Sequence, residues 1–130
     1  MSSQSIELAG RFYESWNGGD PANDCLELLT EDFKYVNPTF AVEGGTRHGH
    51  EGWREVIASL AAGFESYTHD PDEMQQLPNG QVLCTVTFRA RGRSGISIEK
   101  LEPQLLTFSG EKVSRLQWFN DRSEALAQTS

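Results

Sequence analysis

The chain has 130 residues and a formal net charge of −8 at pH 7, which predicts one soluble domain over residues 1–130 and argues against nucleic acid or anionic membranes as partners. No apolar run reaches the roughly 18 residues of a membrane span, no signal peptide opens the chain, and Cys25 and Cys84 lack CxxC spacing. We therefore expect a cytoplasmic protein with reduced thiols.

The first expected element is an amphipathic helix over residues 5–17. One face of it collects the apolar residues, which follow the i, i+3, i+4, i+7 rule: Ala9, Phe12, Tyr13 and Trp16. Two glycines at 18 and 19 end this helix. A second helix is expected to begin behind Asp20 as N-cap, with Pro21 at its first position, and to carry Cys25, Leu26 and Leu29.

A short strand is expected next, at residues 32–38, with Phe33, Tyr35 and Asn37 on one face. A loop rich in glycine (Gly44, Gly45 and Gly49) then leads to a third helix at residues 51–64. Helical spacing again relates the apolar residues of that segment, and Gly63 is its expected C-terminal cap.

From residue 66 the apolar period changes to two, which predicts strands. They are expected at residues 67–77, 82–91, 96–108 and 113–120, with a hairpin turn at Asn79–Gly80 and a short helix at about residues 122–128. Helices come first and a meander of strands follows. This order predicts an α+β domain, in which helices pack on one face of a curved antiparallel sheet.

The strand at residues 82–91 gives the clearest assignment of faces. Its even positions are apolar and alternate with more polar residues, so even positions are expected to point inward. The same face continues through Leu106 and Phe108 to Leu116 and Trp118. It also includes Glu102 and Gln104, provided that Pro103 adds no bulge.

Glu102 is the ionisable group that this pattern offers to the interior. We expect it to be buried, with a pKa above the ordinary value of about 4.3, and we expect no Lys or Arg on the inward face to stabilise its charge. Such a carboxyl can act as a general base or acid. The alternative is a solvated strand residue beside a bulge at Pro103.

Four sequence blocks resemble one known family: FYESWNGGD, LLTEDFKYVNP, HGHEGWREVI and SGEKVSRLQWFNDRSEAL. They are similar to the SnoaL-like branch of the nuclear transport factor 2-like superfamily, which includes ketosteroid isomerase-like and polyketide cyclase-like proteins. The resemblance implies a cone-shaped α+β fold whose curved sheet and N-terminal helices enclose one apolar pocket, in a homodimer.

The catalytic residues of these relatives are not retained as sets. In the alignment with ketosteroid isomerase, Asn37 stands in place of the base, Phe12 in place of the tyrosine and Gln104 in place of the second aspartate. The histidine and aspartate of the polyketide cyclases fall on Gln104 and Trp118. Tyr35 and Asn37 match the tyrosine and asparagine of limonene epoxide hydrolases, whose arginine and aspartates are missing here.

The catalytic candidates are therefore Glu102, which would move a proton, with Tyr35 and Asn37, which would orient a water molecule or a carbonyl group. Alternatively, Tyr35 is a core aromatic residue and Asn37 caps the turn at Pro38. Pocket-lining residues are expected to be Phe12, Trp16, Trp53, Val86, Phe88, Gln104, Leu106, Trp118 and Asn120. The aromatic residues among them can equally belong to an ordinary core.

No metal site is expected at His48 and His50, which are two apart but lack further ligands at zinc spacing. His69 and Asp70 could form an acid–base dyad, but the pair is expected at the surface of an interrupted edge strand. No phosphate loop or dinucleotide motif occurs, so no cofactor is expected.

Two functions remain open. The first is an isomerase, cyclase or hydratase-type enzyme that acts on a small hydrophobic molecule. The second is a non-catalytic ligand-binding or association module of the same fold. A homodimer through the outer face of the sheet is also expected, because Leu83, Leu105 and Phe119 are large residues to leave exposed together.

Overall fold

The computed structural model describes residues 3–38 and 45–127. Within these residues the helices are α1 (Ser3–Trp16), α2 (Pro21–Asp24), the 3-10 helix η1 (Leu26–Leu28), α3 (Gly49–Gly63) and α4 (Arg122–Ala127). The strands are β1 (Leu29–Asn37), β2 (Gly45–His48), β3 (Ser66–Gln76), β4 (Val82–Arg91), β5 (Ser97–Ser109) and β6 (Lys112–Trp118). The predicted α+β class is confirmed.

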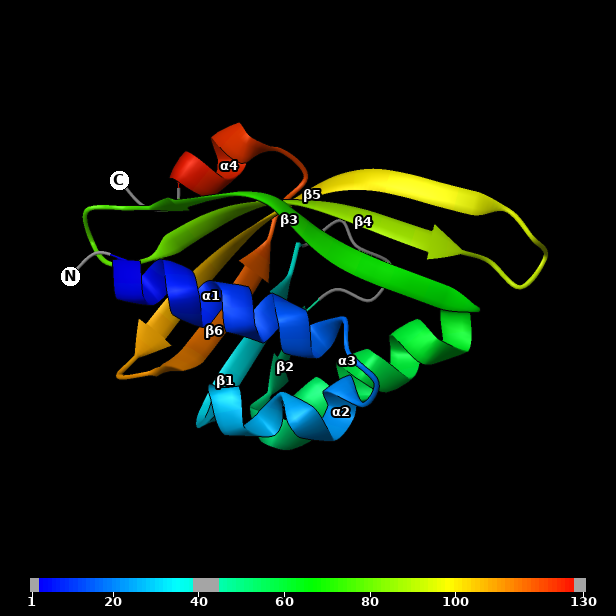
Figure 1. The fold of residues 1–130 in the computed structure, drawn as a ribbon, viewed down its shortest axis with the longest axis horizontal. Coiled ribbons are helices and arrows are strands. Elements are labelled where there is room, and N and C mark those ends of the chain that lie inside the picture. Colours follow the sequence, from blue (N-terminus) through cyan, green and yellow to red (C-terminus); the bar gives the residue numbers. More distant parts are fainter. Residues whose placement is uncertain (1–2, 39–44, 128–130) are drawn as a thin grey trace.

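The strands form one curved sheet in the order β2-β1-β6-β5-β4-β3. The meander from β3 to β6 is antiparallel throughout, as predicted, and β2 is antiparallel to β1. The pairing of β1 with β6 is parallel, so the sheet is mixed rather than wholly antiparallel. Figure 1 shows α1, α2 and α3 on one side of this sheet and α4 on the other.

Three local predictions are wrong in the first half of the chain. The second helix is a single turn followed by η1, and Leu29 already begins β1. The expected glycine-rich loop contains β2, which pairs with β1, while Gly44 lies outside the described residues. Gly63 remains helical, and the cap is Phe64 in an extended conformation, so the chain passes directly towards β3 without a left-handed glycine.

The main core lies between α1, α3 and the inner face of the sheet. The apolar stripe predicted for α1 is confirmed, because Ala9, Phe12, Tyr13 and Trp16 are all buried. From α3, Trp53 and Val56 join the same core. From the sheet, Val82, Cys84 and Val86 of β4 do so, and the burial of all the even positions of β4 agrees with the predicted alternation.

A second, smaller core covers the opposite face of the sheet. It consists of Leu77, Leu83, Leu105, Phe119 and Ala125, the last of which lies on α4. The argument that Leu83, Leu105 and Phe119 are left exposed for a partner chain is therefore wrong, because α4 packs over them (Figure 1). The homodimer itself stays a prediction without that support.

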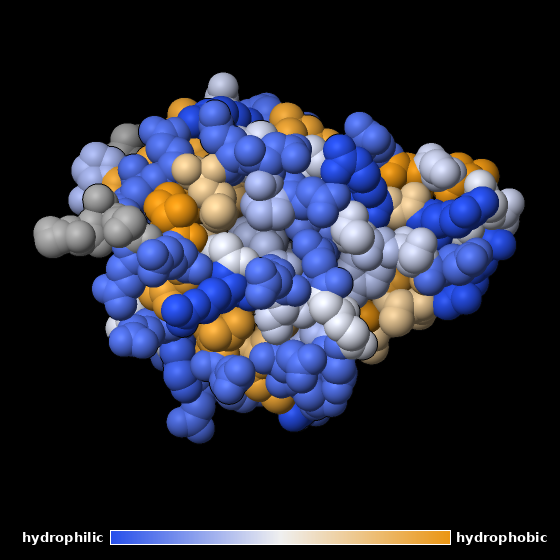
Figure 2. Space-filling model, in the orientation of Figure 1, coloured by the Kyte–Doolittle hydropathy of each residue, from blue (hydrophilic) through white to orange (hydrophobic). Residues whose placement is uncertain are grey.

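The surface visible in Figure 2 is mostly hydrophilic, and its apolar residues form several small patches, one of them at the far end of the β4–β5 hairpin. The large exposed apolar residues of that stretch are Ile96, Ile98 and Leu101. No helix among the described residues is long and apolar enough to cross a membrane.

The start of α3 packs closely on β2, and this contact requires a glycine. A Cβ atom on Gly52 would lie 2.7 Å from the carbonyl carbon of Arg47, which is backbone and cannot turn away. We expect Gly52→Ala to lower the free energy of unfolding by about 1–3 kcal/mol, measured by urea denaturation.

Gly63 in the same helix is the control for that substitution, because a Cβ there would have no atom within 4 Å. Gly63→Ala is expected to leave stability unchanged or to raise it by up to about 1 kcal/mol. Equal losses in the two variants would contradict the proposed clash.

Candidate functional site

The registers of the central strands place Glu102 and Gln104 on the inner face. Glu102 lies opposite Val86 and Gln104 opposite Cys84, and the β4–β5 pairing runs through Pro103 without a shift. The carbonyl of Pro103 accepts a hydrogen bond from the amide of Phe119 at 2.9 Å. The predicted inward orientation is confirmed, and Glu102 is only 7% exposed.

A chain of hydrogen bonds fixes the Glu102 carboxyl. The Tyr13 hydroxyl donates to Gln104 Oε1 at 2.7 Å, and Gln104 Nε2 donates to Glu102 Oε1 at 2.9 Å. Burial raises the pKa of Glu102, and the hydrogen bond from Gln104 together with the charge of Lys100 partly opposes that rise. The carboxyl is therefore held in one orientation, in an environment that favours its protonated form.

Tyr35 contributes a phenol to the same interior. It comes from β1, packs edge-on against Trp16 with ring centroids 6.4 Å apart, and is 6% exposed. Burial raises its pKa far above the ordinary value, and the charge of Glu102 raises it further, so its hydroxyl keeps its proton. A protonated phenol near a carboxyl can donate a hydrogen bond to an oxygen atom of a bound molecule while the carboxyl removes a proton from that molecule.

His69 was predicted at the surface, and this is wrong. It is 1% exposed, and its Nε2 lies 3.8 Å from Glu102 Oε1. The cause is a bulge in β3. Pairing from Gln76 to Glu73 would continue with Asp70 opposite Phe88, but the register shifts between Pro71 and Glu73, which places His69 opposite Phe88 on the inward face.

The surroundings of His69 are aromatic. Its ring stacks on Trp16 with centroids 3.8 Å apart, and the rings of Phe88 and Tyr67 lie beside it at 4.9 and 5.7 Å. Burial lowers the pKa of His69 from 6.5 to about 3. The imidazole is therefore neutral at physiological pH.

Lys100 corrects another expectation, namely that no cation lies on the inward face. It precedes Glu102 by two residues, pairs with Phe88, and holds its Nζ 4.6 Å from the centroid of the Trp118 ring. Its head is exposed to solvent. Along this face of β5, Lys100 is therefore exposed to solvent, whereas Glu102, two residues later, is buried.

Asn37 and Trp118 are joined to each other. Trp118 Nε1 donates to Asn37 Oδ1 at 2.9 Å, and Asn37 Nδ2 donates to the carbonyl of Gly45 at 3.1 Å. Asn37 therefore links β1, β2 and β6, and its amide already has structural partners. Its proposed part in orienting water competes with these bonds.

The other residues predicted to line a pocket lie in the interior, with the exception of Asn120. Phe12, Trp16 and Trp53 form a closed aromatic cluster with centroid distances of 5.0–5.6 Å, and Val86, Phe88 and Leu106 lie on the inner face of the sheet. Asn120 is not brought to this interior, because it lies exposed in the turn between β6 and α4.

Groups of three or more metal-ligating side chains do not occur in the part of the chain that the structure describes. His48 is exposed at the N-cap of α3. His50 lies at the start of that helix, with Nε2 3.2 Å from the carbonyl oxygen of Leu29. The two histidines are thus used in different local contacts.

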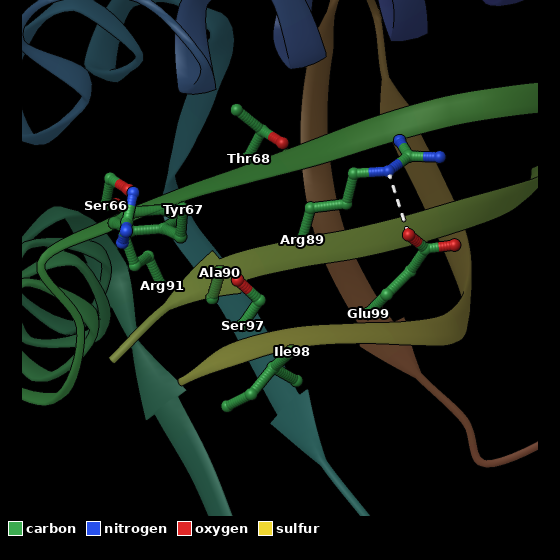
Figure 3. A pocket seen from close by; sticks show the side chains of 9 residues that line it. All are labelled: Ser66, Tyr67, Thr68, Arg89, Ala90, Arg91, Ser97, Ile98 and Glu99. Carbon is green, nitrogen blue, oxygen red and sulfur yellow. Dashed lines mark ion pairs between the residues drawn. The ribbon is translucent and has the colours of Figure 1, made fainter. Parts of the chain in front are cut away.

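Two surface hollows lie near the start of β3, and both include Ser66 and Tyr67. One, of about 290 Å³, is bounded by the ends of α1 and α3 and shares Trp16 and Tyr67 with the surroundings of His69. The other, of about 440 Å³, lies along β3, β4 and β5 and contains none of the Glu102 cluster. Figure 3 shows Arg89 turned towards Glu99 there, with 3.5 Å between Nε and Oε1.

The model of the SnoaL-like domain matches residues 9–116, which is most of the chain. The protein belongs to the SnoaL-like family. No protein of curated function matches this SnoaL-like chain in sequence.

Solved structures share the fold of this SnoaL-like protein. TerC, co-crystallised with polyporic acid, is 21% identical with a TM-score of 0.78, and the match covers 97% of each chain. An NTF2-like protein from Burkholderia pseudomallei is 19% identical, with a TM-score of 0.78 and 96% coverage of each chain. A protein provisionally named a SnoaL-like polyketide cyclase, from Jannaschia sp. CCS1, is 17% identical, with a TM-score of 0.75 and coverage of 96% and 90%. At these identities the likeness shows the fold alone.

Proposed function

We propose that this protein is a cofactor-independent enzyme of the isomerase, cyclase or hydratase type, which uses acid–base chemistry on a small hydrophobic molecule. The observation that carries the proposal is the Glu102 carboxyl, buried with a raised pKa and oriented by Gln104 and Tyr13. Carboxyls perturbed in this way are common at functional sites. The co-crystal of TerC with polyporic acid supports a small molecule as the ligand of this fold.

In the proposed reaction Glu102 removes a proton from carbon, or from a water molecule, and returns it to another atom. A base whose pKa lies nearer the working pH transfers protons more effectively in both directions. Tyr35 donates a hydrogen bond to the substrate oxygen on which negative charge develops. Gln104 is a positioning residue, since it contacts the carboxyl through its amide nitrogen.

The test is loss of proton transfer in Glu102→Gln. Exchange of the α-protons of small cyclic enones and 1,3-diketones in D₂O, followed by proton NMR, reports carbon-acid chemistry directly. We expect the wild-type protein to accelerate exchange and Glu102→Gln to reduce that rate about 100-fold or more. Glu99→Gln is the control, because Glu99 lies on the same strand with its side chain 70% exposed.

The alternative is a ligand-binding module without catalysis. It is favoured by the replacement of family carboxylate positions by Gln104 and Asn37, whose amides already make hydrogen bonds. In that case Glu102→Gln and wild type would bind a neutral apolar dye equally well and neither would accelerate exchange. A homodimeric state and a cytoplasmic location remain part of the proposal.

A further inference from the structure

His69 is fixed in place by two backbone hydrogen bonds and by ring stacking. Its backbone amide donates to Asn17 Oδ1 at 2.8 Å, and its carbonyl accepts from Asn17 Nδ2 at 2.8 Å. These two bonds tie β3 to the end of α1, directly beside the bulge that turns His69 inward. Stacking on Trp16 then fixes the plane of the imidazole.

The two ring nitrogens have different surroundings. Nε2 lies 3.8 Å from Glu102 Oε1, which is an ion-pair distance but longer than a hydrogen bond, so the two groups would have to move closer for a bond to form. Nδ1 is buried and has no hydrogen-bond partner among the described residues. A buried N–H without an acceptor is costly, and placing the proton on Nε2 avoids it at Nδ1 while aiming it at the carboxyl.

We propose that His69, as its Nε2–H tautomer, is a positioning residue that donates to Glu102 Oε1 when the carboxylate is ionised and leaves Oε2 to exchange protons with substrate. Gln104 Nε2 already donates to the same Oε1. Both donors therefore gather on one carboxylate oxygen. This assignment rests on the proposed function only for the role of Oε2, whereas the donor role of His69 can be measured without any substrate.

Other titratable groups around the carboxyl come from four elements. Tyr13 on α1 and Cys84 on β4 lie next to Gln104, Tyr35 is on β1, and Lys100 is on β5. Burial raises the pKa of Tyr13, Tyr35 and Cys84, so these three stay neutral while Glu102 titrates. Lys100 is present equally in wild type and in variants at position 69.

The test follows the Glu102 side-chain carboxyl by carbon-13 NMR from pH 4 to pH 9, with Glu102→Gln to assign its signal. His69→Phe keeps an aromatic ring on Trp16 and removes the donor, so we expect the pKa of Glu102 to rise by about one pH unit. In His69→Gln the amide nitrogen can replace Nε2, and the pKa should return most of the way to the wild-type value. Tyr67→Phe, at another ring beside His69, should leave it unchanged.

An unchanged Glu102 titration in His69→Phe would overturn the proposal. If that variant does not fold, nitrogen-15 shifts of the wild-type imidazole decide instead: an Nε2–H tautomer supports the donor role and an Nδ1–H tautomer refutes it. Failure of α-proton exchange with a normal His69 effect would reject the proposed enzyme while keeping the positioning role. The reverse result would keep the enzyme and reject the role of His69.

Discussion

Between pH 7 and pH 4, His69→Phe is expected to lose about 3 kcal/mol less free energy of unfolding than the wild-type protein. The pKa of His69 is lowered by burial from 6.5 to about 3 in the folded protein. A group whose pKa is lowered in the folded state contributes its full stability above the unfolded pKa. As the pH falls, the unfolded chain binds a proton at this group before the folded chain does, so the stability is lost.

Glu102 acts in the opposite direction, because its pKa is raised by burial and its contribution to stability is lost as the pH rises. In His69→Phe the pKa of Glu102 is expected to rise further, so the variant gains somewhat more stability from Glu102 as the pH falls, and this adds to the effect of removing His69. The measurement is urea denaturation at several pH values. His48→Gln, at an exposed histidine, controls for the removal of one imidazole. Parallel pH profiles of wild type and His69→Phe would show that the pKa of His69 is not lowered in the folded state.

Trp16→Ala is expected to lower the free energy of unfolding by about 3–5 kcal/mol. Trp16 is 1% exposed, and its ring contacts those of Phe12, Trp53 and His69 at centroid distances of 5.5, 5.0 and 3.8 Å. Removing it leaves a large apolar cavity between α1 and the sheet, and it takes away the surface against which His69 is stacked.

Trp118→Ala is the matched control for that substitution. Its ring is only partly buried, and its contacts include a hydrogen bond to Asn37 and a cation–π contact with Lys100. These interactions predict a smaller loss of about 1–2 kcal/mol, measured in the same urea titration. Losses of similar size in the two variants would mean that Trp16 is not the centre of the core.

The parts of the fold that the sequence predicts well are those with a strong local period. The stripe on α1 and the alternation on β4 each need only one element to be read, and the uninterrupted β4–β5 register carries the second pattern across to Glu102. Lys100 could have been placed by the same even-position rule, since it precedes Glu102 by two residues.

His69 required information that no local pattern contains. Counting back from the turn at Asn79–Gly80 without interruption places Asp70 on the inner face, and only the bulge near Pro71 exchanges it for His69. The proline was the available signal, because it cannot donate to the ladder and marks a place where the register can change. The cover provided by α4 was missed for a different reason: a six-residue helix has too short a pattern to reveal which face of the sheet it covers.

The bond between Tyr13 and Gln104 joins residues 91 positions apart, and the one between Asn37 and Trp118 spans 81. Contacts of such long range form only after large loops have closed, and chains that depend on them fold slowly. We therefore expect the polar interior to be assembled late, when α1 packs on a meander that follows it in the chain. A shortened chain that ends before β5 contains neither Glu102 nor Gln104, so the buried carboxyl and the amide bonded to it exist only once β5 is in place.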